Sequence, residues 1–172
     1  MRVLIREVKS NELVSGLIRE GKKHELPTLM DEWEFDFLKK AKESGKQVYI
    51  LVKEESQGVI EGCMVFSIHE TLGPYLDLLE VAPHNKKSTG KYKRVSGCLI
   101  AFACGLSLAQ GETWDKGFLS FRAIGREVES AETLEEYYRE RYGAIKNFHG
   151  FMEIHPEKSH QLIKEYLEKE EE

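Results

Sequence analysis

Short apolar runs separated by polar segments predict a series of β-strands along the chain. The first covers Val3 to Val8. Two more, Gln47 to Lys53 and Val59 to His69, flank a polar spacer of hairpin length, so we expect them to pair antiparallel. Further strands are expected at residues 76–81, 117–123, 144–148 and 151–154.

Apolar residues spaced three and four apart predict helices between these strands. The longest covers residues 95–109, and one of its faces carries Val95, Cys98, Leu99, Phe102, Ala103 and Leu106. Asn11 and Glu12 are expected to cap an earlier helix, which ends at Gly21 and has apolar residues at Leu13, Val14 and Leu17. Three more helices are expected at residues 30–41, 133–142 and 156–167.

The expected order of elements, βααβββαβαββα, places the chain in the mixed α/β class. The strand at 76–81, the helix at 95–109 and the strand at 117–123 form one strand–helix–strand unit. Such a connection makes its two strands parallel, with a right-handed crossover. The chain has 172 residues, enough for one domain with a buried core, so we expect a single domain over residues 1–172.

The net charge of −5 is distributed unevenly along the chain. Acidic residues are spread widely and are most frequent at the C-terminus, whereas lysine and arginine gather between residues 86 and 94. Because nucleic-acid-binding proteins usually carry an excess of positive charge, we expect no nucleic-acid partner.

The three cysteines, Cys63, Cys98 and Cys104, all lie in apolar segments. Their odd number and setting favour buried thiols in a reducing compartment, so we expect a cytoplasmic protein. There is no signal-peptide core and no apolar run near the ~18 residues of a membrane span, so we expect no membrane partner. The six histidines lack metal-ligand spacing, and no metal is expected.

A basic loop leads into the helix expected at residues 95–109. Its cations are Lys86, Lys87, Lys91, Lys93 and Arg94. The first turn of a helix has unpaired backbone N–H groups and the positive end of the helix dipole, so loop and helix together can hold phosphate groups. A solvated surface loop is the alternative that the charge pattern leaves open.

This segment resembles the phosphate-binding loop of the GNAT superfamily of acyl-coenzyme A-dependent N-acetyltransferases. In that family the motif Gln/Arg-x-x-Gly-x-Gly/Ala precedes a long helix, and its backbone amides hold the pyrophosphate of coenzyme A. Residues 91–96, KYKRVS, occupy the motif here, and GCLIAFA follows. Lys91 stands for Gln/Arg, Arg94 replaces the usual Gly, and Ser96 replaces the final small residue.

The resemblance implies a GNAT-like fold, a central and mostly antiparallel sheet flanked by helices, with a parallel pair of strands splayed to admit the cofactor. It implies acetyl-coenzyme A as co-substrate and an amine of a small molecule or peptide as acceptor, and it is compatible with a homodimer. The region from Lys22 to Pro27 would border the acceptor site. The residues implied at the cofactor are Val81, through its backbone N–H, and Lys91, Lys93, Arg94, Val95, Ser96 and Gly97.

Glu80 is the candidate general base, which would remove the proton of the acceptor ammonium. Alternation along the strand places it on one face with Leu76 and Leu78, beside the expected thioester. Asp77 is its nearest rival, and alternation directs that side chain to the opposite face. A strand-end carboxylate that faces water is the alternative for Glu80.

Tyr138 is the candidate general acid, which would protonate the departing thiolate. GNAT proteins commonly have a Tyr four residues before a Gly at the end of the penultimate helix. The segment EYYRERYGA resembles this pattern, with Tyr138 five residues before Gly143. Tyr137 and Tyr142 are rivals, and packing in the core is expected for at least one of the three.

Taken together, these features predict a GNAT-type N-acetyltransferase in which the amine attacks acetyl-coenzyme A directly in a ternary complex. A non-catalytic coenzyme A-binding sensor or interaction module of the same fold is the alternative, because Arg94 and Tyr138 depart from the family pattern. The sequence has neither a Gly-x-Ser-x-Gly elbow nor a Walker-type loop, so hydrolase and NTPase activities lack their residues.

Overall fold

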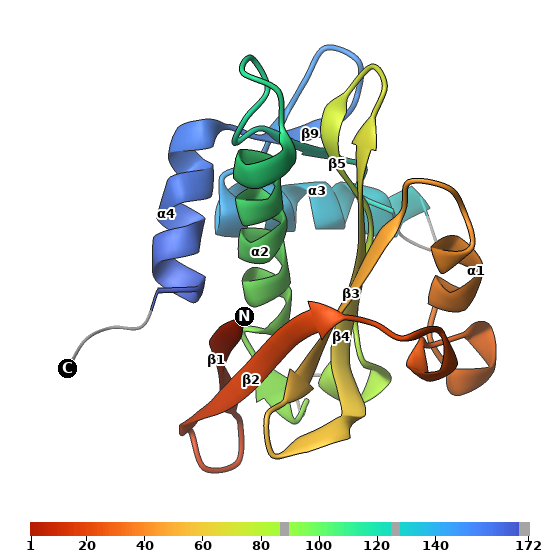
Figure 1. The fold of residues 1–172 in the computed structure, drawn as a ribbon. Coiled ribbons are helices and arrows are strands. Elements are labelled where there is room, and N and C mark those ends of the chain that lie inside the picture. The colour runs from red at the N-terminus through yellow and green to blue at the C-terminus, as the bar shows by residue number, and fades with distance from the viewer. Residues whose placement is uncertain (87–89, 125–127, 169–172) are drawn as a thin grey trace.

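One mixed β-sheet runs through the molecule, with helices on both of its faces (Figure 1). The computed structural model describes residues 1–86, 90–124 and 128–168. Within these ranges the sheet has nine strands in the order β6-β1-β2-β3-β4-β5-β7-β9-β8. The strands are β1 (Arg2–Glu7), β2 (Leu13–Glu20), β3 (Gln47–Lys53), β4 (Ser56–His69), β5 (Gly73–Val81), β6 (Tyr92–Lys93), β7 (Leu119–Phe121), β8 (Ile145–Lys146) and β9 (Met152–Ile154).

Four helices and three short 3-10 turns complete the described chain. The helices are α1 (Phe37–Ala41), α2 (Val95–Gln110), α3 (Val128–Tyr142) and α4 (Pro156–Tyr166). The turns are η1 (Lys23–Glu25), η2 (Leu29–Asp31) and η3 (Pro83–Asn85). Helices α2 and α4 lie side by side on one face of the sheet, and α1 lies on the other (Figure 1).

Neighbouring strands pair antiparallel except β5 and β7, which are parallel. The antiparallel β3–β4 hairpin and the parallel pair joined through α2 are therefore confirmed, as is the mixed α/β class with a mostly antiparallel sheet. Where the chain is described, the ladder between β5 and β7 pairs Tyr75 with Ser120 and Leu76 with Phe121 and extends no further. Beyond Leu76 the two strands part, which is the splay that the resemblance implied.

Alternation along β4 divides the core between the two faces. Met64 and Phe66 are fully buried in the larger cluster, against α2 and α4. Cys63 and Val65 point the other way, into a smaller cluster with Trp33, Phe37 and other residues of the α1 side. The buried side chains of this central strand therefore help to fix the helices on the two faces.

The three cysteines are buried and free in the structure. Burial raises the pKa of Cys98 to about 12 and that of Cys104 to about 11. It raises the pKa of Cys63 well above the ordinary value. All three thiols are therefore protonated near neutral pH.

The expected helix after Asn11 is wrong, because residues Leu13–Glu20 form β2. Asn11 has a left-handed backbone with φ of 58°, and Glu7 N–H donates to Glu12 C=O at 2.9 Å, so this segment is a hairpin turn. Gly16 and Ile18 are buried while Ser15 is exposed, which is the two-residue period of a strand. The three apolar residues at 13, 14 and 17 are compatible with the period of an α-helix and with that of a β-strand.

The expected helix at residues 30–41 is correct only in its last part, Phe37–Ala41. Glu32 has φ of 66°, which ends the η2 turn, and the Asp36 side chain caps α1 by accepting from Lys39 N–H at 2.9 Å. Trp33 and Phe37 are buried in the smaller core cluster on this side of the sheet.

Two glycines allow α2 to approach its neighbours closely. A Cβ at Gly62 would lie 2.6 Å from a methyl group of Val95, so the absence of a side chain lets the start of α2 lie against β4. A Cβ at Gly97 would lie 2.2 Å from the Tyr166 ring, so Gly97 seats α2 against α4.

We expect Gly97→Ala to lower the free energy of unfolding by about 1–3 kcal/mol, the usual effect of overpacking. Gly105→Ala is the matched control on the same helix, because a Cβ there meets nothing within 4 Å. Gly105→Ala should raise stability by about 0.5–1 kcal/mol through helix propensity. Urea denaturation of the two variants checks this, and equal effects would contradict the close contact with Tyr166.

Candidate functional site

A cleft of about 1220 Å³ opens where β5 and β7 part. It is lined by the end of β5, the segment from β6 into α2, and the inner side of α3. Its lining includes Glu80, Val81, Ser96, Tyr138 and Tyr142. The cleft therefore brings together most of the site residues expected from the sequence.

The open edge of β5 presents backbone groups to this cleft. Ala82 N–H donates to Glu61 C=O on β4 at 2.9 Å. Because successive N–H groups of a strand point to opposite edges, Val81 N–H points away from β4. It points toward the edge of β5 that pairs with β7 earlier in the strand, at Tyr75 and Leu76. Val81 also lines the cleft. Its amide is thus a hydrogen-bond donor available to a ligand oxygen.

The first turn of α2 supplies a second set of donors. The N–H groups of Val95, Ser96 and Gly97 have no intrahelical acceptor, as at the start of any α-helix. Val95 and Ser96 line the cleft, so the positive end of the helix dipole faces it. Arg94, the residue before the helix, has φ of 72°, a left-handed conformation that favours glycine. Glycine, which the motif named above usually has at this position, adopts such a conformation without strain.

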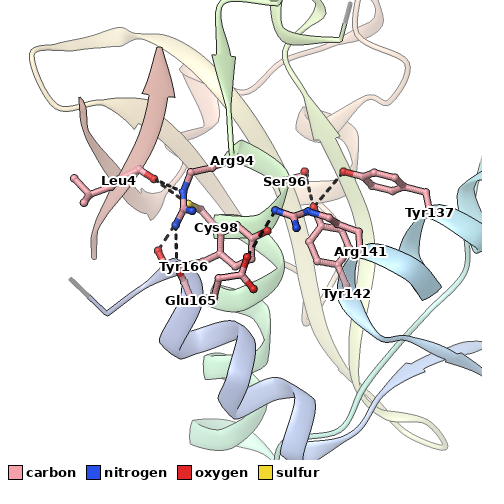
Figure 2. Close-up of polar contacts among 9 residues, drawn as sticks. All are labelled: Leu4, Arg94, Ser96, Cys98, Tyr137, Arg141, Tyr142, Glu165 and Tyr166. Atoms are coloured by element: carbon pink, nitrogen blue, oxygen red, sulfur yellow. Dashed lines mark hydrogen bonds and ion pairs between the residues drawn. The ribbon is translucent and has the colours of Figure 1, made fainter. Parts of the chain in front are cut away.

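The guanidinium of Arg94 binds protein carbonyl groups (Figure 2). Its Nε donates to Leu4 C=O at 3.3 Å and its Nη2 to Glu165 C=O at 2.8 Å. Its Cζ lies 4.8 Å from the centre of the Tyr166 ring. Arg94 thus joins β1 to α4, a structural role that the sequence did not indicate. Whether it also contacts phosphate stays a prediction.

The remaining basic residues are placed unequally around the cleft. Lys93 lines it and is exposed, whereas Lys91 lies over the Tyr92 ring, 5.3 Å from its centre. Lys87 is outside the described residues. Two arginines that the sequence analysis missed, Arg6 and Arg141, also line the cleft.

Arg6 pairs with Lys93 across the β1–β6 ladder, so a strand far away in sequence adds its charge to the loop. Arg141 approaches Glu165 at 3.7 Å. No signal in the local sequence indicates either position, because both depend on the tertiary fold.

Glu80 is 4% exposed and is held by three donors. Its Oε1 accepts from Glu34 N–H at 2.8 Å and from Lys86 Nζ at 2.5 Å, and its Oε2 accepts from Phe35 N–H at 3.1 Å. The segment before α1 is thereby fixed to the end of β5. A carboxylate oxygen can accept two hydrogen bonds, and among the described residues Oε2 has one donor, Phe35 N–H.

The expectation that Asp77 faces away from Glu80 is wrong. The β4–β5 register shifts between Val65 and Phe66, so Asp77 is the extra residue of a β-bulge. Asp77 accepts from Ser67 Oγ at 2.6 Å and pairs with Lys46. Ser67 alternates with Val65 and lies on the α1 side, the side of Glu80.

The same bulge also changes which residues lie on the same face of the sheet as Glu80. Leu76 belongs to the core cluster of α2, whereas Leu78 packs in that of α1. Glu80 therefore shares a face with Leu78 but not with Leu76.

The three tyrosines of α3 differ in their surroundings. Tyr142 is 1% exposed, and its hydroxyl lies 2.9 Å from Ser96 Oγ and 3.4 Å from the Tyr137 hydroxyl (Figure 2). Tyr138 packs edge-on against Phe121, and within the described residues its hydroxyl has no hydrogen bond. Burial raises the pKa of Tyr138 to about 12 and raises that of Tyr142 as well. Both are protonated near neutral pH and could donate a proton.

The described chain holds no group of three or more His, Cys, Asp or Glu residues that could bind a metal ion. Among the described helices, none is long and apolar enough to cross a membrane.

The arrangement of sheet, splayed strands and α2 is the GNAT fold. No family model matches the chain, and no curated protein matches it. Among solved structures, the KacTA–DNA complex contains a chain with 12% identity and a TM-score of 0.60, over 87% of this chain and 99% of that one. The structure of AtaTR bound with acetyl-coenzyme A has 14% identity and a TM-score of 0.58, and the match covers 86% of this chain and 98% of that one. A Desulfovibrio desulfuricans protein assigned to the GNAT acetyltransferases has 12% identity and a TM-score of 0.53, and the match covers 82% of this chain and 99% of that one.

The prediction that the protein has no nucleic-acid partner, which was based on its net charge, is wrong. A structure with this fold has been solved as a complex with DNA. A net charge of −5 describes the whole chain, whereas binding depends on the charge of one surface and of any assembled partner.

We expect Arg94→Ala to lower the free energy of unfolding by about 1.5–3 kcal/mol, the range for a charged hydrogen bond. Arg94→Gly should be about 1 kcal/mol less destabilising than Arg94→Ala, because glycine adopts a positive φ at no steric cost. Lys93→Ala is the matched control and should leave stability unchanged, since Lys93 is exposed. Thermal and urea unfolding check the order; Arg94→Ala as stable as the wild type would contradict the joining role.

Proposed function

We propose that this protein is an N-acetyltransferase, which transfers an acetyl group from acetyl-coenzyme A to a primary amine of a small molecule or peptide. The observation that carries the proposal is one cleft in which the open edge of β5, the first turn of α2, a buried carboxylate and tyrosine side chains meet. The binding of acetyl-coenzyme A to AtaTR, which has the same fold, supports it. The free, buried thiols suit a cytoplasmic location.

The residues present fit acetyl-coenzyme A. The amides of Val95, Ser96 and Gly97 would hold its pyrophosphate, and Lys93 with Arg6 would complement the negative charge. The open edge of β5 would pair with the amide groups of the pantetheine arm. When bound, acetyl-coenzyme A supplies the thioester carbon that the acceptor amine attacks.

Three residues would carry the transfer. Glu80 would take the ammonium proton of the acceptor amine, since its buried carboxylate lines the cleft. Val81 N–H would stabilise negative charge on the thioester oxygen. Tyr138 would protonate the departing thiolate, a role suited to a hydroxyl whose pKa of about 12 keeps it protonated.

A non-catalytic coenzyme A-binding module is the second candidate function. One observation favours it: Glu80 already accepts from two backbone amides and from Lys86, as a purely structural carboxylate would. Turnover separates the two candidates, because a binder retains acetyl-coenzyme A and releases no thiol.

The decisive experiment measures free thiol released from acetyl-coenzyme A in the presence of a panel of amines, such as a polyamine, an amino acid and a lysine peptide. We expect release with an accepted amine. Tyr138→Phe should lower the rate by about 10²–10⁴-fold, the effect of a lost general acid, and leave calorimetric binding of acetyl-coenzyme A unchanged.

Tyr142→Phe is the control for this experiment. It removes a hydrogen bond to Ser96, so it should cost about 1 kcal/mol of stability and little of the rate. A large loss of rate in Tyr142→Phe, with none in Tyr138→Phe, would reassign the acid. Binding of acetyl-coenzyme A without thiol release for any amine would establish the binder.

The base is tested by the pH dependence of Glu80→Gln. This variant should bind acetyl-coenzyme A normally and lose kcat/KM most severely at low pH, where nearly all of the acceptor amine is protonated. Its rate should recover partly as pH approaches the pKa of the amine. Asp77→Asn is the matched control, since Asp77 pairs with Lys46 and Ser67. If Glu80→Gln kept the acid limb of the wild-type profile, another group would take the proton.

A further inference from the structure

Lys86 places a primary amine beside the proposed base. Its Nζ lies 2.5 Å from Glu80 Oε1 and 3.3 Å from Glu34 Oε1. Its side chain is 31% exposed, whereas that of Glu80 is almost fully buried. Lys86 lines the same cleft as Val81 and Tyr138.

The contact differs from an ordinary surface ion pair. Backbone amides of Glu34 and Phe35 hold the Glu80 carboxylate, so its position does not depend on a flexible partner. The amine bound to it is therefore also confined, at a distance suited to transfer of its proton. The carboxylates of Glu34 and Glu80 together form a site for one ammonium group, and the chain fills this site with its own lysine.

We propose that Lys86 occupies the acceptor position of the cleft and is acetylated within its own chain. The inference rests on the proposed transfer from acetyl-coenzyme A. Glu80 takes a proton from the Lys86 ammonium, and Nζ then attacks the thioester carbon. The new C–N bond forms as the C–S bond breaks. Nζ gives up its second proton, the departing thiolate takes up one proton and leaves as coenzyme A, and the proton held by Glu80 passes to solvent. The reaction needs no further reactant.

This placement also defines the class of external acceptor. An external substrate must displace Lys86 from Glu34 and Glu80, so it is a primary amine that enters as a cation. Acetylation removes the charge of Lys86 and ends its pairing with the two carboxylates. The site for an external ammonium group is then vacated.

The test incubates the full chain with isotope-labelled acetyl-coenzyme A and follows each lysine by peptide mass spectrometry. Lys91 and Lys93 are internal controls on the same loop, because the structure shows neither beside a carboxylate in the described residues. We expect Lys86 to react about a hundredfold faster than either, the lower end of what a positioned base contributes. The rate should not depend on protein concentration, since the reaction is within one chain.

Two variants and one competitor complete the test. Glu80→Gln should reduce acetylation of Lys86 to the rate of Lys91, and Lys86→Arg should keep the positive charge and abolish the modification at this site. Saturating butylamine should slow acetylation of Lys86 in the unaltered protein, which tests the shared site even where Glu80→Gln does not fold.

The inference and the proposed function fail in different ways. If an external amine releases thiol while Lys86 reacts no faster than Lys91 and Lys93, the inference is overturned and the transferase stands. If calorimetry shows no binding of acetyl-coenzyme A and no lysine is labelled, both are overturned.

Discussion

The early end of the ladder between β5 and β7 is the constraint on which the rest of the structure depends. Two paired positions join these parallel strands, and beyond Leu76 no strand of the described chain lies beside this edge of β5. A sheet edge in the middle of a protein leaves backbone groups without partners, and here those groups, including Val81 N–H, face a cleft. The β-bulge at Asp77 lies where the strands part, and it turns the following residues so that Glu80 meets the segment before α1. Cleft, donor groups and carboxylate therefore share one cause.

The start of α2 shows how one position can serve structure and site together. Arg94 adopts a left-handed backbone, which costs a non-glycine residue about 1 kcal/mol, and this orients the first amides of α2 toward the cleft. Its side chain offsets that cost by binding carbonyls of β1 and α4 and stacking on Tyr166. The C-terminal helix is thereby coupled to the geometry of the proposed phosphate site, although it supplies none of the expected phosphate ligands.

The sequence predicted helix α2 from its long apolar segment and the β3–β4 hairpin from the polar spacer between two apolar runs. It predicted the parallel β5–β7 pair from the order strand, helix, strand. It failed at Leu13–Glu20, where three apolar residues suit both helix and strand and a left-handed Asn11 decides for a hairpin. It also failed to place Asp77, because a bulge is an interruption of register that one strand alone does not reveal. The sequence could not place Arg6 and Arg141 at the cleft, nor the contacts of Glu34 and Phe35 with Glu80, because these arise from segments joined only by tertiary folding.

The buried thiols have a practical consequence for any work on this protein. A thiol reacts as the thiolate, and Cys63, Cys98 and Cys104 are all enclosed and held in the protonated form by their raised pKa values. The cysteines of the folded chain should therefore react very slowly with disulfide reagents at neutral pH. Uptake of such a reagent by the protein would report the opening of its core, residue by residue: Cys63 for the α1 side of the sheet, and Cys98 and Cys104 for the α2 side. Three cysteines thus serve as built-in probes of local unfolding on the two faces of one sheet.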